Sequence, residues 1–404
     1  MLFKDFQVAN DLNDLELKPQ MLSIFKSRKQ KIADAVLGME RGELLGKKAV
    51  KALLAIPPLE LRVEMGPYCN MNCSFCYGDY GPHREEYMKP NIMKLLMSQI
   101  KDTDITRLTL SDGEPTHNKD NLMEILDHID GFPTHIFTNG MFAKTYESAK
   151  DMLESMKKHK FSTAVPKQKI PGLHSYSGIT VSADRYHGEA SYGWAINLAR
   201  AFRDTFKGKG LPIHGLLIHN VQPKAVSPED AFTNEELNEK FVKPFEAIYG
   251  ELYKLSDEII PLPGYILANR EFNVPIAVVG LNKIGRAKNL PGISERKLED
   301  INFEFAPSDQ REIFLRHNGD VYAGGGSCTS SGRLLGNIKE KPLKQMCDEY
   351  MVDPAFQIFK LGGVKGVLSA LEKKGYQPGI TATGACDACK QIFADPKALS
   401  LLRE

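Results

Sequence analysis

Residues 60–77 read ELRVEMGPYCNMNCSFCY and place a predicted strand, Glu60–Met65, directly before a loop with three cysteines. The cysteines are Cys69, Cys73 and Cys76, in the spacing Cys-x3-Cys-x2-Cys. Soft thiolate ligands suit iron–sulfur clusters, and a tight loop can wrap three of them around one face of a cubane. Because three ligands serve four irons, this pattern predicts one open iron that can coordinate a small molecule.

Downstream of this loop, short apolar segments alternate with longer amphipathic ones. Strand–helix repetition with crossovers of this length predicts parallel strands with helices outside the sheet. Six units are too few for a closed eight-stranded barrel, so we expect an α/β fold with an open, partial (β/α)6 TIM-like barrel. The other predicted strands are Arg107–Ser111, His135–Thr138, Gly178–Ser182, Ile213–His219 and Ile276–Val279. The predicted helices are Ile92–Lys101, Asn121–Ile129, Tyr146–Lys158, Ala190–Phe206 and Asn234–Leu255.

Polar loops follow four of these strands. In parallel α/β sheets, the chemistry gathers at the carboxyl ends of the strands. We therefore expect four loops to converge on one face of the sheet. They contain Cys69, the run Asp112-Gly113-Glu114-Pro115, the run Thr138-Asn139-Gly140 and the run Ser182-Ala183-Asp184.

These motifs resemble the radical S-adenosylmethionine (SAM) superfamily over roughly residues 59 to 290. The cysteine spacing, with the aromatic Phe75 before the third cysteine, is the hallmark of that family, and residues 112–115 resemble its Gly-Gly-Glu-Pro motif with Asp112 in place of the first glycine. The resemblance implies a [4Fe–4S] cluster on the three cysteines, which also makes them the catalytic residues, and SAM on the open iron. It implies cofactor-binding roles for Phe75, Gly113, Glu114, Pro115, Asn139, Ser182 and Asp184.

The resemblance also implies an activity. The reduced cluster would pass one electron to the sulfonium of SAM, and the 5′-deoxyadenosyl radical would remove a hydrogen atom from a substrate carbon. In such an enzyme the cofactors generate the radical, and the protein supplies binding and orientation. We expect net oxidation or bond formation on a small molecule or a peptide, with flavodoxin or ferredoxin as the electron donor.

Four further cysteines lie near the C-terminus, at Cys328, Cys347, Cys386 and Cys389. With the preceding predicted hairpin of residues 313–316 and 321–323, they resemble the SPASM/twitch domains that follow many radical SAM barrels. The resemblance implies an auxiliary [4Fe–4S] cluster, in which Cys347 is the least secure ligand. Structural zinc uses the same thiolates. Cys347 is also interpretable as a small buried hydrophobic residue on a helix.

Two other functions compete with this interpretation. A radical SAM epimerase needs a free cysteine as hydrogen donor, and Cys347 supplies one if it is not a ligand. A zinc-binding interaction protein is the alternative from a different class, with Cys69, Cys73, Cys76 and His83 as a Cys3His site. Beyond the motifs, candidate substrate-contacting residues, each also interpretable as a solvated loop residue, are Arg185, Tyr186, His187, Glu189 and Arg286.

The length, charge and composition of the chain indicate its domain organisation and its location in the cell. The 404 residues divide into a predicted N-terminal helical segment (1–58), the barrel (59–290) and a small C-terminal iron–sulfur domain (291–404). The formal net charge of +1 provides no general attraction to nucleic acid or to an anionic membrane. We find no membrane-spanning apolar run and no secretory signal, so we expect a cytoplasmic protein.

Overall fold

The computed structural model describes most of the predicted barrel and C-terminal region. The described residues are 60–161, 177–206, 215–222, 234–255, 264–268, 273–280, 312–324, 331–380, 382 and 385–404. The predicted helical segment 1–58, Cys328 and Arg286 lie outside them.

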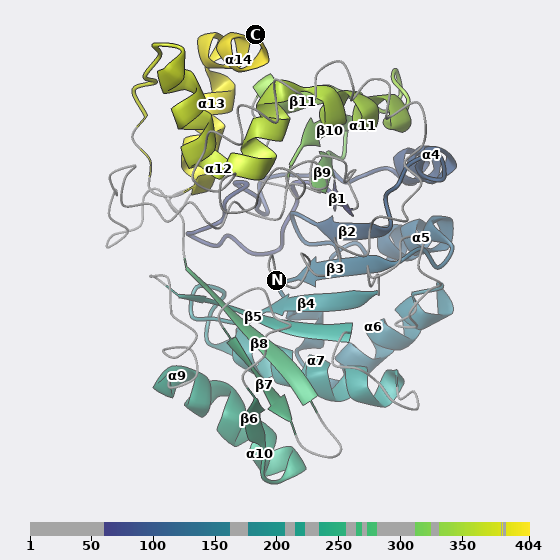
Figure 1. Ribbon diagram of the computed structural model, residues 1–404. Helices are drawn as coiled ribbons and strands as arrows, with labels where there is room; N and C mark the ends of the chain where they lie inside the picture. Colours follow the sequence, from purple (N-terminus) through teal and green to yellow (C-terminus); the bar gives the residue numbers. More distant parts are fainter. Residues whose placement is uncertain are drawn as a thin grey trace, which may run out of the picture.

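The centre of the fold is a run of parallel strands that carries all six predicted strands in order (Figure 1). They pair side by side in the sequence β1-β2-β3-β4-β5-β8, within an 11-stranded sheet of the described residues. Their bounds are β1 (Glu60–Glu64), β2 (Arg107–Ser111), β3 (Thr134–Thr138), β4 (Gly178–Ser182), β5 (Leu216–Gln222) and β8 (Asn273–Gly280).

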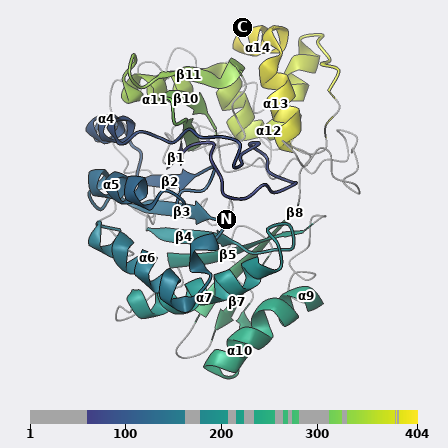
Figure 2. The same cartoon turned by 180° about the vertical axis from the view of Figure 1, so that it is seen from behind.

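Four helices between these strands cover one face of the parallel sheet (Figures 1 and 2). Each is amphipathic and turns its apolar side inward, as Ile92, Met93, Leu96 and Ile100 of the first helix do. Burying such apolar stripes against the sheet drives the layered arrangement. The helices are α4 (Pro90–Ile100), α5 (Lys119–Ile129), α6 (Tyr146–Lys158) and α7 (Ala190–Thr205), with the short turn η2 (Met141–Ala143) before α6.

Within the described residues the sheet does not close on itself, because its two edges, β11 and β6, do not pair with each other. The prediction of a partial α/β barrel with a parallel core is therefore confirmed. The carboxyl ends of β1 to β4 share one side of the sheet, since all four strands run parallel and in register. That side is where the sequence places its polar loops.

The predicted helix 234–255 is wrong at its C-terminal end. The chain forms α9 (Glu235–Leu237), the π-helical turn η4 (Asn238–Val242) and α10 (Lys243–Tyr249), and then turns into β6 (Tyr253–Leu255). Gly250 ends the helix with φ of 77° and ψ of −167°, a backbone conformation that is open almost only to glycine. Strand β6 pairs antiparallel with β7 (Gly264–Ala268), which pairs antiparallel with β8, and the prediction missed both strands, of which β6 forms the edge of the sheet.

The predicted C-terminal hairpin forms, and it extends the barrel sheet. Strand β9 (Glu312–Leu315) pairs in parallel with β1, and β10 (Asp320–Ala323) and β11 (Leu334–Asn337) follow it in antiparallel pairs. Gly319, at φ of 102°, makes the Asn-Gly turn between β9 and β10. The turn η7 (Ser331–Arg333) and four helices complete this end of the molecule: α11 (Leu343–Val352), α12 (Pro354–Lys373), α13 (Ala385–Ala394) and α14 (Pro396–Arg403).

Candidate active site

The three-cysteine loop leaves the carboxyl end of β1 and is closed at its base by backbone hydrogen bonds. Cys69 N donates to Gly81 O at 3.3 Å, and Gly81 N donates to Pro67 O at 3.3 Å. Within the loop, Cys76 N donates to Cys73 O at 3.2 Å. All three thiols are partly exposed, so the loop holds them on the surface of the sheet's carboxyl edge.

Three cysteine side chains in one loop form a donor set that a metal cluster can use, provided that the cluster offsets the cost of ionising them. Burial, the charge of Glu114 and the neighbouring Cys73 and Cys76 raise the pKa of the Cys69 thiol to about 12. A free Cys69 therefore stays protonated near neutral pH, whereas metal binding requires the thiolate. Positive charge from a metal core would offset the repulsion that disfavours three adjacent thiolates.

The loop after β2 lies directly against the cysteine loop. Glu114 N donates to Tyr68 O at 2.8 Å, which joins the Asp112-Gly113-Glu114-Pro115 segment to the residue before Cys69. Asp112 and Gly113 both have positive φ, 67° and 64°. A Cβ at Gly113 would collide with the carbonyl oxygens of Gly66 and Tyr68, so the close approach of the two loops requires glycine there.

Glu114 connects the loops after β2 and β3. Its carboxylate is 3% exposed. One oxygen, Oε1, accepts hydrogen bonds from Thr116 N at 3.0 Å and Thr138 Oγ1 at 2.7 Å, and Oε2 accepts one from Asn139 N at 2.7 Å. These hydrogen bonds satisfy the buried Glu114 carboxylate and hold the loops after β2 and β3 together at the carboxyl edge of the sheet.

Asn139 extends this connection to the cysteine loop itself. Its Nδ2 donates to Asn70 Oδ1 at 2.8 Å and lies 3.8 Å from Cys69 Sγ, and its Oδ1 accepts from Met141 N at 2.9 Å. The sequence placed Asn139 near the site from its position at the end of a strand, and the structure brings it into contact with Cys69.

Phe75 links the cysteine loop to the loop after β4. Its ring centroid lies 4.9 Å from that of His187, edge to face, and 5.4 Å from that of Tyr186. Of the other candidates on this loop, Arg185 is exposed with its guanidinium 5.1 Å from the Tyr186 ring centroid, and Glu189 forms an exposed ion pair with Lys240. Tyr186 and His187 are therefore the two residues of this loop whose rings contact Phe75.

Asp184 is fully buried, and its carboxylate organises its own loop. Oδ1 accepts from Tyr186 N at 2.8 Å and His187 N at 3.0 Å, and Oδ2 lies 2.9 Å from His187 Nδ1. Ser182 lies two residues earlier, half-buried at the end of β4, where it pairs with His219 of β5. Contacts of Ser182 and Asp184 with a ribose stay predictions.

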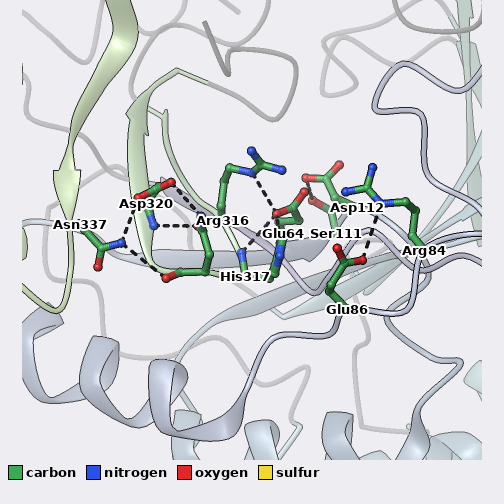
Figure 3. A network of polar contacts seen from close by, with 10 residues as sticks. Glu64, Arg84, Glu86, Ser111, Asp112, Arg316, His317, Asp320 and Asn337 are labelled. Atoms are coloured by element: carbon green, nitrogen blue, oxygen red, sulfur yellow. Dashed lines mark hydrogen bonds and ion pairs between the residues drawn. The ribbon is translucent and has the colours of Figure 1, made fainter. Parts of the chain in front are cut away.

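The sequence interpretation missed a network of polar contacts around Glu64, at the end of the strand from which the cysteine loop departs (Figure 3). Glu64, the last residue of β1, binds Arg316 and His317 of the β9–β10 turn, and Asp112 lies beside it with Ser111 Oγ donating to Asp112 Oδ2 at 3.1 Å. One signal was available. Glu60, Arg62 and Glu64 occupy alternate positions of a strand whose other residues are apolar, so their side chains share one charged face of the strand.

Three of the four C-terminal cysteines lie in the described residues, on two different helices. Cys386 and Cys389 lie on the first turn and a half of α13, where Arg333 Nη1 donates to Cys389 Sγ at 2.8 Å. Cys347 is buried on α11, and burial, followed by the charges of Asp348 and Asp104, raises the pKa of its thiol to about 12. Asp104 precedes β2, at the opposite end of the sheet from Cys69.

The described part of the chain contains neither an assembled metal-ion site nor a membrane-spanning helix. No three His, Cys, Asp or Glu side chains within it gather closely enough to hold a single metal ion. This result includes Cys69, Cys73, Cys76 and His83 alike, so it does not distinguish the Cys3His zinc site from a cluster on the three cysteines. Within the same residues, no helix has both the length and the apolar character that a membrane span requires.

Comparison with known proteins defines the class of the barrel. Residues 63–212 match the model of the Radical SAM superfamily, so the chain carries a radical SAM domain. The match begins within β1 and includes the three cysteines, residues 112–115 and the loop after β4.

Among individual proteins, the chain is similar to a probable GTP 3′,8-cyclase of Thermoplasma volcanium, with 28% identity over 135 residues. The alignment spans 32% of this chain and 41% of the relative, well under half of that protein's length. Solved structures with similar shapes include Streptococcus suis SuiB bound to its precursor peptide SuiA (17% identity, 77% of this chain and 67% of that chain, TM-score 0.38). Another is anSMEcpe with bound AdoMet (12% identity, 85% and 99%, TM-score 0.44).

Proposed function

We propose that this protein reductively cleaves SAM and uses the resulting carbon radical to remove a hydrogen atom from a substrate. The observation that carries the proposal is the joining of two motif loops. The backbone bond from Glu114 N to Tyr68 O, and the close approach at Gly113, bring the cysteine loop and residues 112–115 together. The match of residues 63–212 to the Radical SAM superfamily supports the same chemistry.

The residues of the chain have distinct tasks in this proposal. Cys69, Cys73 and Cys76 would hold a [4Fe–4S] cluster and leave one iron for SAM. When bound, the cluster supplies the single electron that breaks a carbon–sulfur bond of SAM. Residues 113–115 would position the amino group of SAM, with Asn139 fixing Cys69 beside them and Phe75 closing the side toward β4. Ser182 and Asp184 would lie near the ribose.

We further propose that the reaction gives net oxidation or bond formation on a small molecule or a peptide. An epimerase needs a thiol beside the substrate radical. Cys347 does not fit that role, because it is buried on α11 near Asp104, at the amino-terminal end of the sheet. A flavodoxin or ferredoxin would supply electrons to the cluster.

We also propose an auxiliary cluster, with a smaller set of ligands than the four C-terminal cysteines that the sequence predicted. Cys386 and Cys389 are spaced i and i+3, so they share one face of α13, and its N-terminal turn favours thiolates through the helix dipole. We propose these two with Cys328 as ligands. Cys347 lies on a different helix, α11, and is left out of this set; Cys389 is buried as well, so burial alone does not separate a ligand from a core residue here.

The test is anaerobic incubation of the iron-loaded protein with dithionite and SAM, without substrate. Slow release of 5′-deoxyadenosine is expected from the wild type, and none from Cys73→Ala. Cys347→Ala is the matched control, since it removes a cysteine thiol outside the loop. It should keep both the release and the iron content of the wild type. Absence of 5′-deoxyadenosine from the iron-loaded wild type would contradict the proposal.

A further inference from the structure

The β9–β10 turn touches the end of the strand from which the cysteine loop departs. Because β9 runs parallel to β1 with Leu315 opposite Val63, the next residues, Arg316 and His317, lie beside Glu64. These residues are about 250 positions apart in the chain. Figure 3 shows both side chains converging on the Glu64 carboxylate.

Glu64 is a buried carboxylate whose hydrogen bonds come from this turn. It is 1% exposed, and its Oε2 accepts from Arg316 Nε at 3.2 Å, from His317 N at 3.2 Å and from His317 Nδ1 at 2.6 Å. Burial opposes the ionised form, but the His317 hydrogen bond and the Arg316 charge outweigh it, so the pKa of Glu64 is lowered. A buried charge with such partners is strongly unfavourable once one of them is removed.

On its other side, Glu64 adjoins both motif loops. Met65, the next residue, donates its N–H to Ser111 O at 2.9 Å and so connects β1 to the residue before Asp112. Tyr80, which is 7% exposed, lies within range of the Glu64 charge, and its backbone N–H donates to Cys76 Sγ at 3.4 Å. A continuous chain of contacts therefore runs from His317 through Glu64 to the cysteine loop.

We propose that Arg316 and His317 are positioning residues for the SAM site: by hydrogen-bonding the Glu64 carboxylate, they hold the end of β1 where the cysteine loop and Asp112 need it. The inference rests on the proposed function and extends it, because it makes the C-terminal hairpin a structural part of the SAM site. The hairpin lies outside residues 63–212, the part of the chain that matches the superfamily.

The test compares substitutions on the same hairpin. His317→Ala removes the 2.6 Å contact, whereas His317→Asn keeps a side-chain N–H in the place of Nδ1. Asn337→Ala is the matched control, because it loosens the hairpin at its bond to Asp320 Oδ1 (2.9 Å) without touching Glu64. Each protein is loaded with iron anaerobically, its fold is checked by circular dichroism, and its dissociation constant for SAM is measured by equilibrium dialysis.

We expect the dissociation constant to rise about tenfold or more in His317→Ala, as for the loss of a hydrogen bond to a charged group. The SAM-induced change in the electron paramagnetic resonance (EPR) spectrum of the reduced cluster should weaken in parallel. His317→Asn and Asn337→Ala should stay near the wild type. If His317→Ala does not fold, Arg316→Gln takes its place, with the same expected rise.

Two results would overturn the inference. One is a wild-type dissociation constant and spectrum in the folded His317→Ala or Arg316→Gln protein. The other is an equal loss in Asn337→Ala, which would assign the effect to general loosening of the hairpin. Failure of the wild type itself to bind SAM would contradict the proposed function instead, so the two failures are distinguishable.

Discussion

Asp112 and Gly113 are neighbours that both adopt left-handed backbone conformations, for different reasons. Asp112 stands where the related motif has glycine, and aspartate is one of the few other residues that enters this region of conformational space at modest cost. Position 113 accepts only glycine, because the cysteine loop occupies the space that a side chain would need.

Gly113→Ala should therefore destabilise the protein beyond the cost of its backbone conformation. Left-handed alanine alone costs about 1–2 kcal/mol, and the clash with the Gly66 and Tyr68 carbonyls adds to it. Gly131→Ala is the control, with φ of 75° and nothing within 4 Å of an added Cβ. Urea unfolding of the metal-free proteins under reducing conditions measures the difference, and equal losses in the two variants would refute this explanation.

The buried carboxyl group of Asp112 should also make the stability of the protein depend on pH. Burial raises its pKa to about 7, opposed by the charge of Arg62 and reinforced by those of Glu64 and Glu312, with Arg316 opposing. The folded state therefore binds its proton more tightly than the unfolded state does, so this group's contribution to stability is present at acid pH. It falls as the pH rises from about 4 to 7 and is level above that range.

Asp112→Asn removes this dependence, because the amide stays neutral. Each pKa unit corresponds to about 1.4 kcal/mol. The free energy of unfolding of Asp112→Asn, relative to the wild type, should therefore rise between pH 4 and pH 8 by an amount on the order of 4 kcal/mol. Denaturant unfolding at the two pH values measures it, and an unchanged difference would show that burial does not raise the pKa of Asp112 in the folded protein.

At the scale of elements, the sequence predicted those features that local residue patterns determine. All six parallel strands and the helices α4 to α7 follow from periodicity and turn signals, and the Asn-Gly turn located the β9–β10 hairpin. The pairing of β9 with β1 could not be predicted, because no local signal says which strand a distant hairpin will join. The Glu64 contacts with Arg316 and His317 depend on that pairing, so they were missed as well.

The loop after β4 is an element whose shape depends on one side chain. Asp184→Ala removes the acceptor for the Tyr186 and His187 N–H groups, and with it the placement of the two rings against Phe75. We expect SAM-dependent release of 5′-deoxyadenosine to fall about tenfold, from the loss of more than one buried hydrogen bond. Asp184→Asn keeps an Oδ1 acceptor and should retain most of the activity. Equal loss in both variants would mean that the negative charge of Asp184 itself is needed.

At the scale of the whole molecule, one continuous sheet joins the radical SAM domain to the C-terminal hairpin. The sequence indicated a separate C-terminal unit because its composition changes to glycine and cysteine. Composition carries no information on pairing between strands. For the same reason, cysteine spacing grouped Cys347 with Cys386 and Cys389, although the described structure places Cys347 in the core beside α4.

The central claim is that the cluster on Cys69, Cys73 and Cys76 has one iron open to SAM. The most direct test is EPR spectroscopy of the dithionite-reduced protein with Cys386 and Cys389 replaced by alanine, so that the N-terminal cluster dominates the signal. We predict a [4Fe–4S] signal whose g values shift when SAM is added, and its loss in a protein that also carries Cys73→Ala. A [4Fe–4S] signal that SAM leaves unchanged, or no cluster signal at all, would contradict the claim.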